Sequence, residues 1–238
     1  MKQLLRVIKN LSIDFLKSDC EENNMIKFLK QANLSSTSKI LDVGCGYGRN
    51  MKLIKRHLGL EIEGVEINQH IVDENIKNGL RCCTVEEFQK RDSNEQYDCM
   101  IFSHVVEHFY PNDLKQFLEG YLKFLRVGGV IIVATPLLWK GFYWDFDHIK
   151  PYHPIGFNMV FGKDNAQVQY YGSVQLELQD IWFRKNPYQV HYCRGLYVKD
   201  WSSYICHAMN LLYAFLFKIS FGVIGVTNGW MGMYKKIK

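Results

Sequence analysis

The segment from Ile40 to Asn50, Ile-Leu-Asp-Val-Gly-Cys-Gly-Tyr-Gly-Arg-Asn, constrains the fold of this chain more than any other segment. The run Lys39–Val43 predicts a short buried strand, glycines follow it at once, and a helical pattern begins near Arg49. Glycine has no Cβ, so a glycine turn between a strand and a helix lets the backbone lie directly against a ligand. The order of strand, turn and helix therefore predicts an α/β sheet that carries a nucleotide-type site.

The spacing of the glycines narrows the choice of ligand. Gly44, Gly46 and Gly48 form the pattern Gly-x-Gly-x-Gly, whereas a dinucleotide-binding turn has the pattern Gly-x-Gly-x-x-Gly. Asp42 lies just ahead of the first glycine, and no basic residue lies inside the turn. We therefore expect a cationic ligand that carries no phosphate group.

A second acidic residue follows the next predicted strand. The apolar run Leu60–Val65 ends at Glu66, and Ile67–Ile76 then predicts a helix. An acid at the tip of the second strand, about twenty residues beyond the first glycine, is placed to accept two hydrogen bonds from a ribose diol. The alternative is a solvated carboxylate that favours the dipole of the following helix.

Composition limits the class of protein. The chain has 238 residues, 47% of them hydrophobic, which is enough for one large α/β domain with additions. The net charge of +5 is mild and no basic run is interleaved with aromatics, so nucleic acid is disfavoured as a substrate. Seven cysteines without a Cys-x-x-Cys pair, and an N-terminus without a long apolar centre, predict a reduced, cytoplasmic protein.

Asp42 and the glycine turn resemble motif I of the class I S-adenosylmethionine (SAM) dependent methyltransferases. The segment Ser103–Phe109, Ser-His-Val-Val-Glu-His-Phe, resembles the loop after strand four in the branch that includes ubiquinone-type O-methyltransferases and sugar- or lipid-modifying relatives. Leu125–Pro136 resembles the fifth motif, and the matches run in family order over residues 38–136. The resemblance implies a doubly wound, seven-stranded Rossmann-like sheet, mostly parallel with one antiparallel strand, with helices on both faces.

The same resemblance implies SAM as the methyl donor and S-adenosylhomocysteine as the product. The residues expected to bind this cofactor are Asp42, Gly44, Cys45, Gly46, Gly48, Glu66, Ile67, Thr84, Val85, Ser103 and His104. Family members often have Gly-Asp where this chain has Cys83-Thr84, so that the contact with adenine is left to the Thr84 hydroxyl.

Three histidines are candidates for the base that removes a proton from the acceptor, because imidazole titrates near neutral pH. His108 and His148 are ranked first and His104 next, although each can instead be structural. The letters His-x-x-Glu-His at residues 104–108 also match the inverted zinc-protease signature. We expect no metal, because these residues directly follow a strand and Pro111 comes soon after them.

The chain is expected to divide into three segments. Residues 1–34 carry two helical patterns, Leu4–Leu16 and Glu21–Ala32, which form either a lid over the cofactor or a packing pair. Residues 35–136 form the SAM-binding core, and residues 137–238 form a substrate-facing part of the same domain.

Several elements are predicted after the fourth strand. Asn112–Arg126 predicts a helix that Asn112 or Asp113 caps and that a glycine C-cap in Val127-Gly128-Gly129 ends, before a fifth strand at Val130–Ala134. Leu137–Phe157 is rich in aromatics, which form either a wall for a flat, lipid-like or sugar acceptor or a plug for the sheet end. Val168–Phe183 predicts one or two strands, and Gly222–Lys235 predicts the antiparallel strand between strands five and six.

Asp200–Phe217 predicts a nearly uncharged helix that is too short to cross a bilayer. A core helix under the sheet is the first expectation. The alternatives are peripheral contact of residues 204–217 with the inner membrane face, or a dimer face, so the chain is expected to be a monomer or a homodimer.

Together these patterns predict a SAM-dependent methyltransferase that acts on a small-molecule, sugar or lipid-linked acceptor at an oxygen atom. The first alternative is a non-catalytic protein that binds SAM or S-adenosylhomocysteine in a regulatory or structural role. The second is a nicotinamide-dependent dehydrogenase, against which the position of Gly48 argues.

Overall fold

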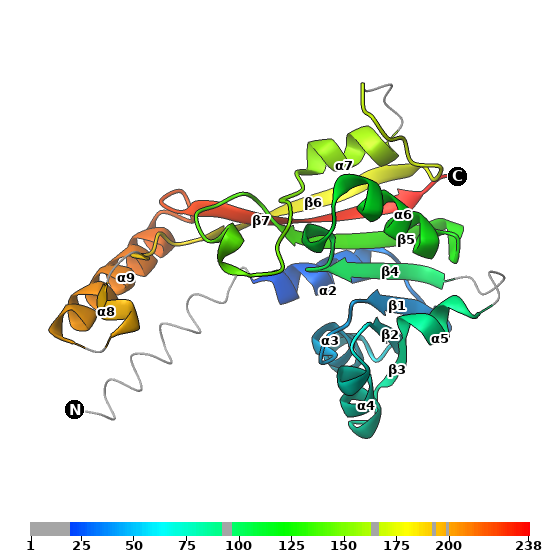
Figure 1. The fold of residues 1–238 in the computed structure, drawn as a ribbon, viewed down its shortest axis with the longest axis horizontal. Coiled ribbons are helices and arrows are strands. Elements are labelled where there is room, and N and C mark those ends of the chain that lie inside the picture. The colour runs from blue at the N-terminus through cyan, green and yellow to red at the C-terminus, as the bar shows by residue number, and fades with distance from the viewer. Residues whose placement is uncertain (1–19, 92–96, 163–166, 192–193, 199) are drawn as a thin grey trace. The chain divides into compact units, whose positions relative to one another are not determined.

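A computed structural model describes residues 20–91, 97–162, 167–191, 194–198 and 200–238. Its seven strands form a sheet in the order β3-β2-β1-β4-β5-β7-β6 (Figure 1). The strands are β1 (Ile40–Val43), β2 (Ile62–Glu66), β3 (Arg81–Thr84), β4 (Tyr97–Ser103), β5 (Leu125–Pro136), β6 (Leu176–Asn186) and β7 (Val226–Lys236). Neighbours from β3 to β5 pair in parallel, whereas β7 pairs antiparallel with β5. The doubly wound, mostly parallel sheet predicted from the sequence is confirmed.

Helices follow most of the strands along the chain. They are α2 (Glu21–Gln31), α3 (Arg49–Leu58), α4 (Gln69–Lys77), α5 (Val85–Gln89), α6 (Pro111–Leu122), α7 (Pro154–Phe161), α8 (Arg194–Tyr197) and α9 (Trp201–Ile219). Short 3-10 turns lie at Val106–His108 and Phe142–Trp144. The predicted helix at Leu4–Leu16 lies outside the described residues.

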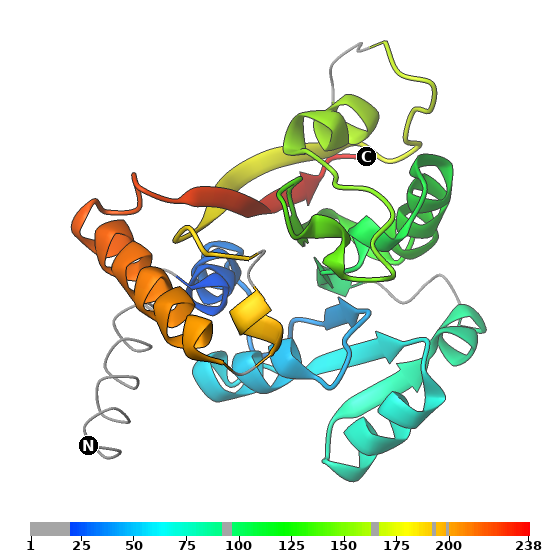
Figure 2. The ribbon, with the colours of Figure 1, turned by 60° about the vertical axis from the view of Figure 1, so that its left-hand side comes forward.

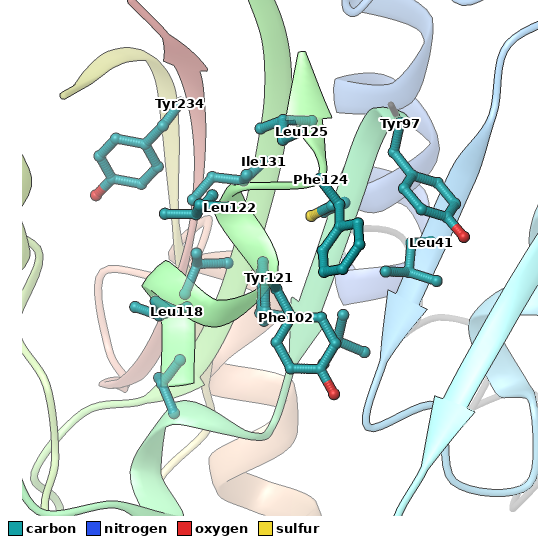
Figure 3. Close-up of a cluster of buried hydrophobic side chains, with 14 of the residues drawn as sticks. Leu41, Tyr97, Phe102, Leu118, Tyr121, Leu122, Phe124, Leu125, Ile131 and Tyr234 are labelled. Atoms are coloured by element: carbon teal, nitrogen blue, oxygen red, sulfur yellow. The ribbon is translucent and has the colours of Figure 1, made fainter. Parts of the chain in front are cut away.

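Each face of the sheet has its own apolar core, because successive side chains of a strand point to opposite faces. Leu41, Phe102 and Ile131 point to one face and pack with apolar residues of α5, α6 and α7. Ile40 and Ile101 point to the other face and pack with residues of α2 and α3. Figure 3 shows the first core, in which Leu118, Tyr121 and Leu122 of α6 lie over the strands. Helices on both faces explain why these strands are apolar throughout.

Helix α6 differs from its prediction at both ends. Tyr110 is the N-cap and Pro111 the first helical residue, so the predicted cap at Asn112 or Asp113 is wrong. Proline suits this position because the first helical N–H has no partner within the helix. The predicted glycine C-cap is also wrong, since the helix ends at Leu122 and Gly128 (φ 83°) lies inside β5, where the pairing with β4 shifts register.

The chain divides into two compact units. One comprises Glu21–Trp182 with Gly229–Lys238, and the described part of the other comprises Cys20 with Phe183–Asn228. Helix α9 belongs to the second unit, where α8 lies beside it (Figure 2). Cys206 is the one buried residue of α9, so the expectation of a core helix is wrong. Among the described helices, none combines the length and apolar character that crossing a bilayer requires.

Candidate cofactor and acceptor site

The glycine turn is tied to the end of β2 by backbone hydrogen bonds. The N–H groups of Gly44 and Cys45 both donate to the Val65 carbonyl, at 2.8 and 3.1 Å. Asn75 of α4, which is 1% exposed, donates from Nδ2 to the Gly46 carbonyl at 2.7 Å. Sequence reasoning missed Asn75, because nothing in its local pattern indicates a contact with a turn about thirty residues earlier.

The three glycines of the turn have positive φ but different surroundings. A Cβ on Gly44 would lie 2.5 Å from Val105 Cγ2, and a Cβ on Gly48 would lie 2.4 Å from Leu80 Cδ1. A Cβ on Gly46 would meet no atom of the described residues within 4 Å. Gly44 and Gly48 therefore permit close packing, whereas Gly46 borders open space that a ligand can enter.

Glu66 joins the second motif to the first. Its carboxylate is nearly buried, and Oε2 accepts a hydrogen bond from the Gly46 N–H at 2.9 Å. Oε1 accepts from the N–H groups of Ile67 and Asn68, at 2.9 and 3.2 Å. The Ile67 side chain is 77% exposed. The acid at the tip of β2 thus lies against Gly46, the glycine of the turn whose added Cβ would meet no described atom within 4 Å.

Asp42 is a buried acid behind the turn. It is 0% exposed, and Asn50 Nδ2 donates to its Oδ1 at 3.4 Å. Its Oδ2 has no hydrogen-bond partner within the described residues. Burial raises the pKa of this carboxyl to about 7, against the opposing effect of the Asn50 hydrogen bond. A nearby cation would favour its ionised form.

Thr84 and Val85 begin α5. Thr84 Oγ1 accepts from the Glu87 N–H at 3.1 Å, and Glu87 Oε2 accepts from the Thr84 N–H at 2.9 Å, so the pair forms a capping box. Val85 is half-buried against the core. The Thr84 hydroxyl oxygen therefore already accepts one hydrogen bond within the chain.

His104 follows Ser103 at the end of β4 and lies between two carboxylates. It has φ 57°, an uncommon conformation for a residue other than glycine. Its Nε2 lies 3.0 Å from Glu21 Oε1, and its Nδ1 lies 3.3 Å from Glu107 Oε1. Burial disfavours the charged imidazole, but the hydrogen bonds with Glu107 and Glu21 outweigh it and raise the pKa of His104 to about 9. A protonated imidazole cannot accept a proton, so His104 is suited to positioning rather than to base catalysis.

We expect these ion pairs to make stability depend on pH. The pKa of His104 in the folded state, about 9, exceeds its ordinary value of 6.5, so the stabilisation is present below pH 6.5 and is lost as the pH rises to about 9. In His104→Gln, the free energy of unfolding measured with urea should decrease less between pH 6.5 and about 9 than it does in the parent. Replacement of His70 on the exposed face of α4 should leave the pH dependence of the parent unchanged. Parent and His104→Gln curves of equal slope would contradict the assignment.

The structure brings His108 and His148 together from separate segments. Their ring centroids are 5.1 Å apart. His108 Nδ1 lies 3.0 Å from the Asp147 carbonyl oxygen, and His148 Nδ1 lies 2.7 Å from the Phe142 carbonyl oxygen. A carbonyl can only accept, so each Nδ1 carries the hydrogen and each Nε2 keeps a free lone pair in the neutral ring.

Glu107, which the sequence argument used only as part of a motif, is fully buried beside His104 and His148. It is 0% exposed, and its Oε2 accepts from the Thr135 hydroxyl at 3.0 Å. Its Oε1 lies 4.0 Å from His148 Nε2. Its spacing of three residues from His104 is the sequence signal that could have found it.

The aromatic residues after β5 divide into two groups. Phe142 and Phe157 are buried in the core. Tyr143, Trp144 and Phe146 are 63%, 51% and 99% exposed. Asp145 lies among the exposed group, with Oδ2 3.7 Å from His148 Nε2. The segment therefore serves both as core and as an exposed aromatic surface beside His148.

The chain resembles known methyltransferases in sequence. A family model described as a methyltransferase domain matches residues 20–204. The chain is 34% identical over 112 residues to the human mitochondrial ubiquinone biosynthesis O-methyltransferase. This alignment covers 41% of this chain and 28% of that protein. It is 31% identical over 122 residues to the ubiquinone biosynthesis O-methyltransferase of a Bradyrhizobium species, covering 48% of this chain and 46% of that protein. The chain thus spans less than half the length of these curated relatives.

Among solved structures, a SAM dependent methyltransferase from Archaeoglobus fulgidus superposes with a TM-score of 0.56 at 19% identity. The alignment covers 91% of this chain and 95% of that chain. At this identity the likeness shows a shared fold.

Proposed function

This chain belongs to the methyltransferase domain family, and from that premise we propose that it transfers a methyl group from SAM to an oxygen atom of a small-molecule acceptor. The observation that carries the proposal is the 2.9 Å hydrogen bond between Gly46 and Glu66. It joins a backbone position open to a ligand with an acid suited to a ribose. The product that remains would be S-adenosylhomocysteine.

The cofactor would bind along the ends of β1, β2 and β4. A carboxylate offers about four lone-pair positions, and Glu66 already accepts three N–H groups. Accepting both hydroxyls of a ribose therefore requires the release of at least one of these bonds, and the Gly46 bond joins Glu66 to the ligand-facing turn. Asp42 would favour the cationic end of SAM, and Ile67, being exposed, would pack on adenine.

Methyl transfer from SAM requires little of the protein beyond orientation of the two substrates. The sulfonium of SAM is already electrophilic, so the chain must hold the acceptor oxygen in line with the methyl group, about 3 Å away, and accept its proton. The Nε2 lone pairs of His108 and His148 are suited to accept this proton. The O-methyltransferase relatives support oxygen as the target. The exposed aromatics beside His148 support a flat or lipid-like acceptor.

We expect Glu66→Ala to weaken SAM binding about 10- to 100-fold, the cost of removing a charged hydrogen-bond acceptor. Isothermal titration calorimetry with SAM and with S-adenosylhomocysteine measures the effect. Glu61→Ala, which removes an exposed carboxylate one residue before β2, is the matched control and should bind like the parent. A Glu66→Ala Kd within twofold of the parent would argue against the ribose role.

The activity itself is tested by label transfer. Purified protein with methyl-labelled SAM is incubated with polar and lipid-soluble metabolite fractions, and transfer into either fraction supports the proposal. Tight SAM binding without transfer into any fraction would favour the non-catalytic alternative. Binding of NADH in place of SAM would favour a dehydrogenase.

Peripheral membrane contact is proposed for α9. Its large apolar side chains are exposed: Trp201, Tyr204, Ile205, Met209, Leu211, Leu212, Phe215 and Ile219. In the described part of residues 183–228, the charged side chains are Arg184, Lys185, Arg194 and Lys218 against Asp200. An apolar helix face in a basic unit suits an anionic bilayer surface.

Vesicle sedimentation tests this contact. The parent should sediment with phosphatidylglycerol vesicles more than with phosphatidylcholine vesicles, and Leu212→Ser with Phe215→Ser should abolish the difference. If the parent stays in the supernatant and forms dimers that the double variant does not, α9 is a dimer face and the membrane proposal fails.

A further inference from the structure

We propose that Cys45 of the glycine turn and Cys82 of β3 form a reversible disulfide bond, and that this bond weakens SAM binding. Their Sγ atoms lie 3.6 Å apart, although the two residues are 37 positions apart in the sequence. The inference rests on the proposed function, since it adds control by an oxidant to the same cofactor site. It agrees with the expectation of a reduced protein, because disulfides that form in reducing compartments are mostly transient and serve redox sensing or catalysis.

Gly64 of β2 allows the two thiols to meet. It pairs in register with Cys82 on the parallel neighbouring strand. A Cβ on Gly64 would lie 2.6 Å from Cys45 Sγ and 3.0 Å from Cys45 Cβ, so the Cys45 side chain occupies the space that a side chain at position 64 would fill. Neighbouring strands lie about 4.8 Å apart, so a thiol packed against Gly64 is within reach of Cys82. The sheet itself therefore holds the two sulfur atoms in contact.

The two cysteines differ in exposure and in acidity. Cys45 is 7% exposed, whereas Cys82 is only half-buried. Hydrogen bonds from the Cys45 thiol and from Asn75 Nδ2, the latter at 3.7 Å, lower the pKa of Cys82 against the effect of burial. The contact with Cys82, together with burial, raises the pKa of Cys45. Because the thiolate is the reactive form of cysteine, Cys82 is the sulfur that reacts first with an oxidant, and Cys45 is the one that completes the disulfide.

The oxidant is a hydroperoxide, of which hydrogen peroxide is the simplest. The Cys82 thiolate attacks one peroxide oxygen, so that a sulfur–oxygen bond forms, the oxygen–oxygen bond breaks, and the departing hydroxide takes up a proton to give water. The Cys45 sulfur then loses its proton and attacks the sulfur of the Cys82 sulfenic acid, whose oxygen leaves as a second water. The two thiols lose two electrons and the peroxide gains two. A dithiol reductant reverses the change by thiol–disulfide exchange.

The disulfide would act on the part of the turn that faces the ligand. A disulfide bond is about 2.05 Å long, so the sulfur atoms must approach each other by about 1.5 Å. Asn75 Nδ2 lies 3.8 Å from Cys45 Sγ and also donates to the Gly46 carbonyl at 2.7 Å. Movement of Cys45 would therefore displace Gly46, whose N–H donates to Glu66. Loss of one hydrogen bond to a charged group weakens binding at least about 10-fold.

The position of β3 favours this movement. It lies at one end of the strand order of the sheet (Figure 1). Among the described strands it pairs with β2 alone. A shift of Cys82 towards Cys45 therefore disturbs the pairing with one strand rather than with two.

The disulfide is tested by peptide mapping. The full chain is reduced with dithiothreitol, desalted, treated with hydrogen peroxide, blocked with iodoacetamide and digested with trypsin. Mass spectrometry should find the peptide of residues 40–49 joined to the peptide of residues 82–90, and dithiothreitol should remove this product. The second peptide also contains Cys83, which packs on the opposite face of β3. Cys83→Ser is therefore the matched control and should keep the link, whereas Cys82→Ser should lose it. In Cys45→Ser, dimedone should trap Cys82 as the sulfenic acid.

Calorimetry with SAM measures the consequence. Peroxide should raise the Kd of the parent and of Cys83→Ser at least about 10-fold, and dithiothreitol should restore it. Cys82→Ser should bind SAM equally well before and after peroxide, which shows that the variant is folded. Bound SAM should in turn slow formation of the linked peptide in the parent, because coupling between two binding equilibria is reciprocal.

Absence of the linked peptide from the peroxide-treated parent, or its persistence in Cys82→Ser, would overturn the proposal. A linked parent that binds SAM within twofold of the reduced parent would overturn the control of binding and leave the proposed function standing. A reduced parent that binds no SAM would count against the proposed function, and the linked peptide would then support the disulfide alone.

Discussion

His148→Ala is expected to lower kcat about 100-fold while leaving the Kd for SAM within twofold of the parent. An imidazole that accepts a proton contributes about 10²- to 10⁴-fold to rate. His148 lies outside the cofactor turn and its Nδ1 is held by the Phe142 carbonyl, so the effect should fall on turnover. Initial rates at saturating SAM, with calorimetry on the same preparations, measure both quantities.

The matched controls use other histidines. His70→Ala on the exposed face of α4 should retain the parent kcat. The kcat of His108→Ala should fall as that of His148→Ala does, because the two rings lie 5.1 Å apart and each Nε2 keeps a free lone pair. A kcat for His148→Ala within threefold of the parent, with labelled product formed normally, would remove His148 from the reaction.

Gly44→Ala is expected to destabilise the fold by about 3 kcal/mol, a large part of the stability of a typical domain. The new Cβ would lie 2.5 Å from Val105 Cγ2, and the residue has φ 69°. The left-handed conformation costs about 1–2 kcal/mol for a residue with a Cβ, and overpacking costs about 1–3 kcal/mol. Urea unfolding followed by circular dichroism measures the loss, and SAM binding should weaken with it.

Three variants separate the cost of the left-handed conformation from the cost of overpacking. Gly44→Ala with Val105→Ala should recover the overpacking part but not the conformational part. Gly46→Ala should show the conformational part alone, because its Cβ would meet no described atom within 4 Å. Gly120→Ala, in α6 and also without a neighbour within 4 Å, should be stabilising by about 0.5–1 kcal/mol. A Gly44→Ala protein as stable as the parent would contradict this account of the turn.

The strands and the fold class could be predicted because their signals are local. The predicted strand Lys39–Val43 corresponds to β1 within one residue at each end, and the apolar run Leu60–Val65 that ends at Glu66 overlaps β2. Apolar runs of this length, each followed by a turn and a helical period, allow few topologies. The antiparallel strand predicted at Gly222–Lys235 is observed as β7, between β5 and β6.

Other features could not be predicted, because they depend on what a segment meets in space. Asp113 is a good capping residue by type, yet Tyr110 is the N-cap, since Pro111 already suits the first helical position. The apolar pattern of α9 predicted a buried helix. Whether an apolar face is covered depends on the rest of the chain, and in this structure most of the large apolar side chains of α9 are exposed. An amphipathic pattern predicts which face of a helix is apolar, but it does not predict what covers that face.

By itself, the sequence determined the sheet, the family resemblance and the pair formed by the glycine turn and Glu66. These features could be predicted because the strand end, the turn and the acid follow one another along the chain at a regular spacing. Only the tertiary structure decided which of the candidate histidines lie together. His108 follows β4 and His148 follows β5, and these segments meet because parallel neighbouring strands end at the same edge of the sheet. The approach of His148 to the buried Glu107 carboxylate spans about forty residues, and no local pattern encodes it.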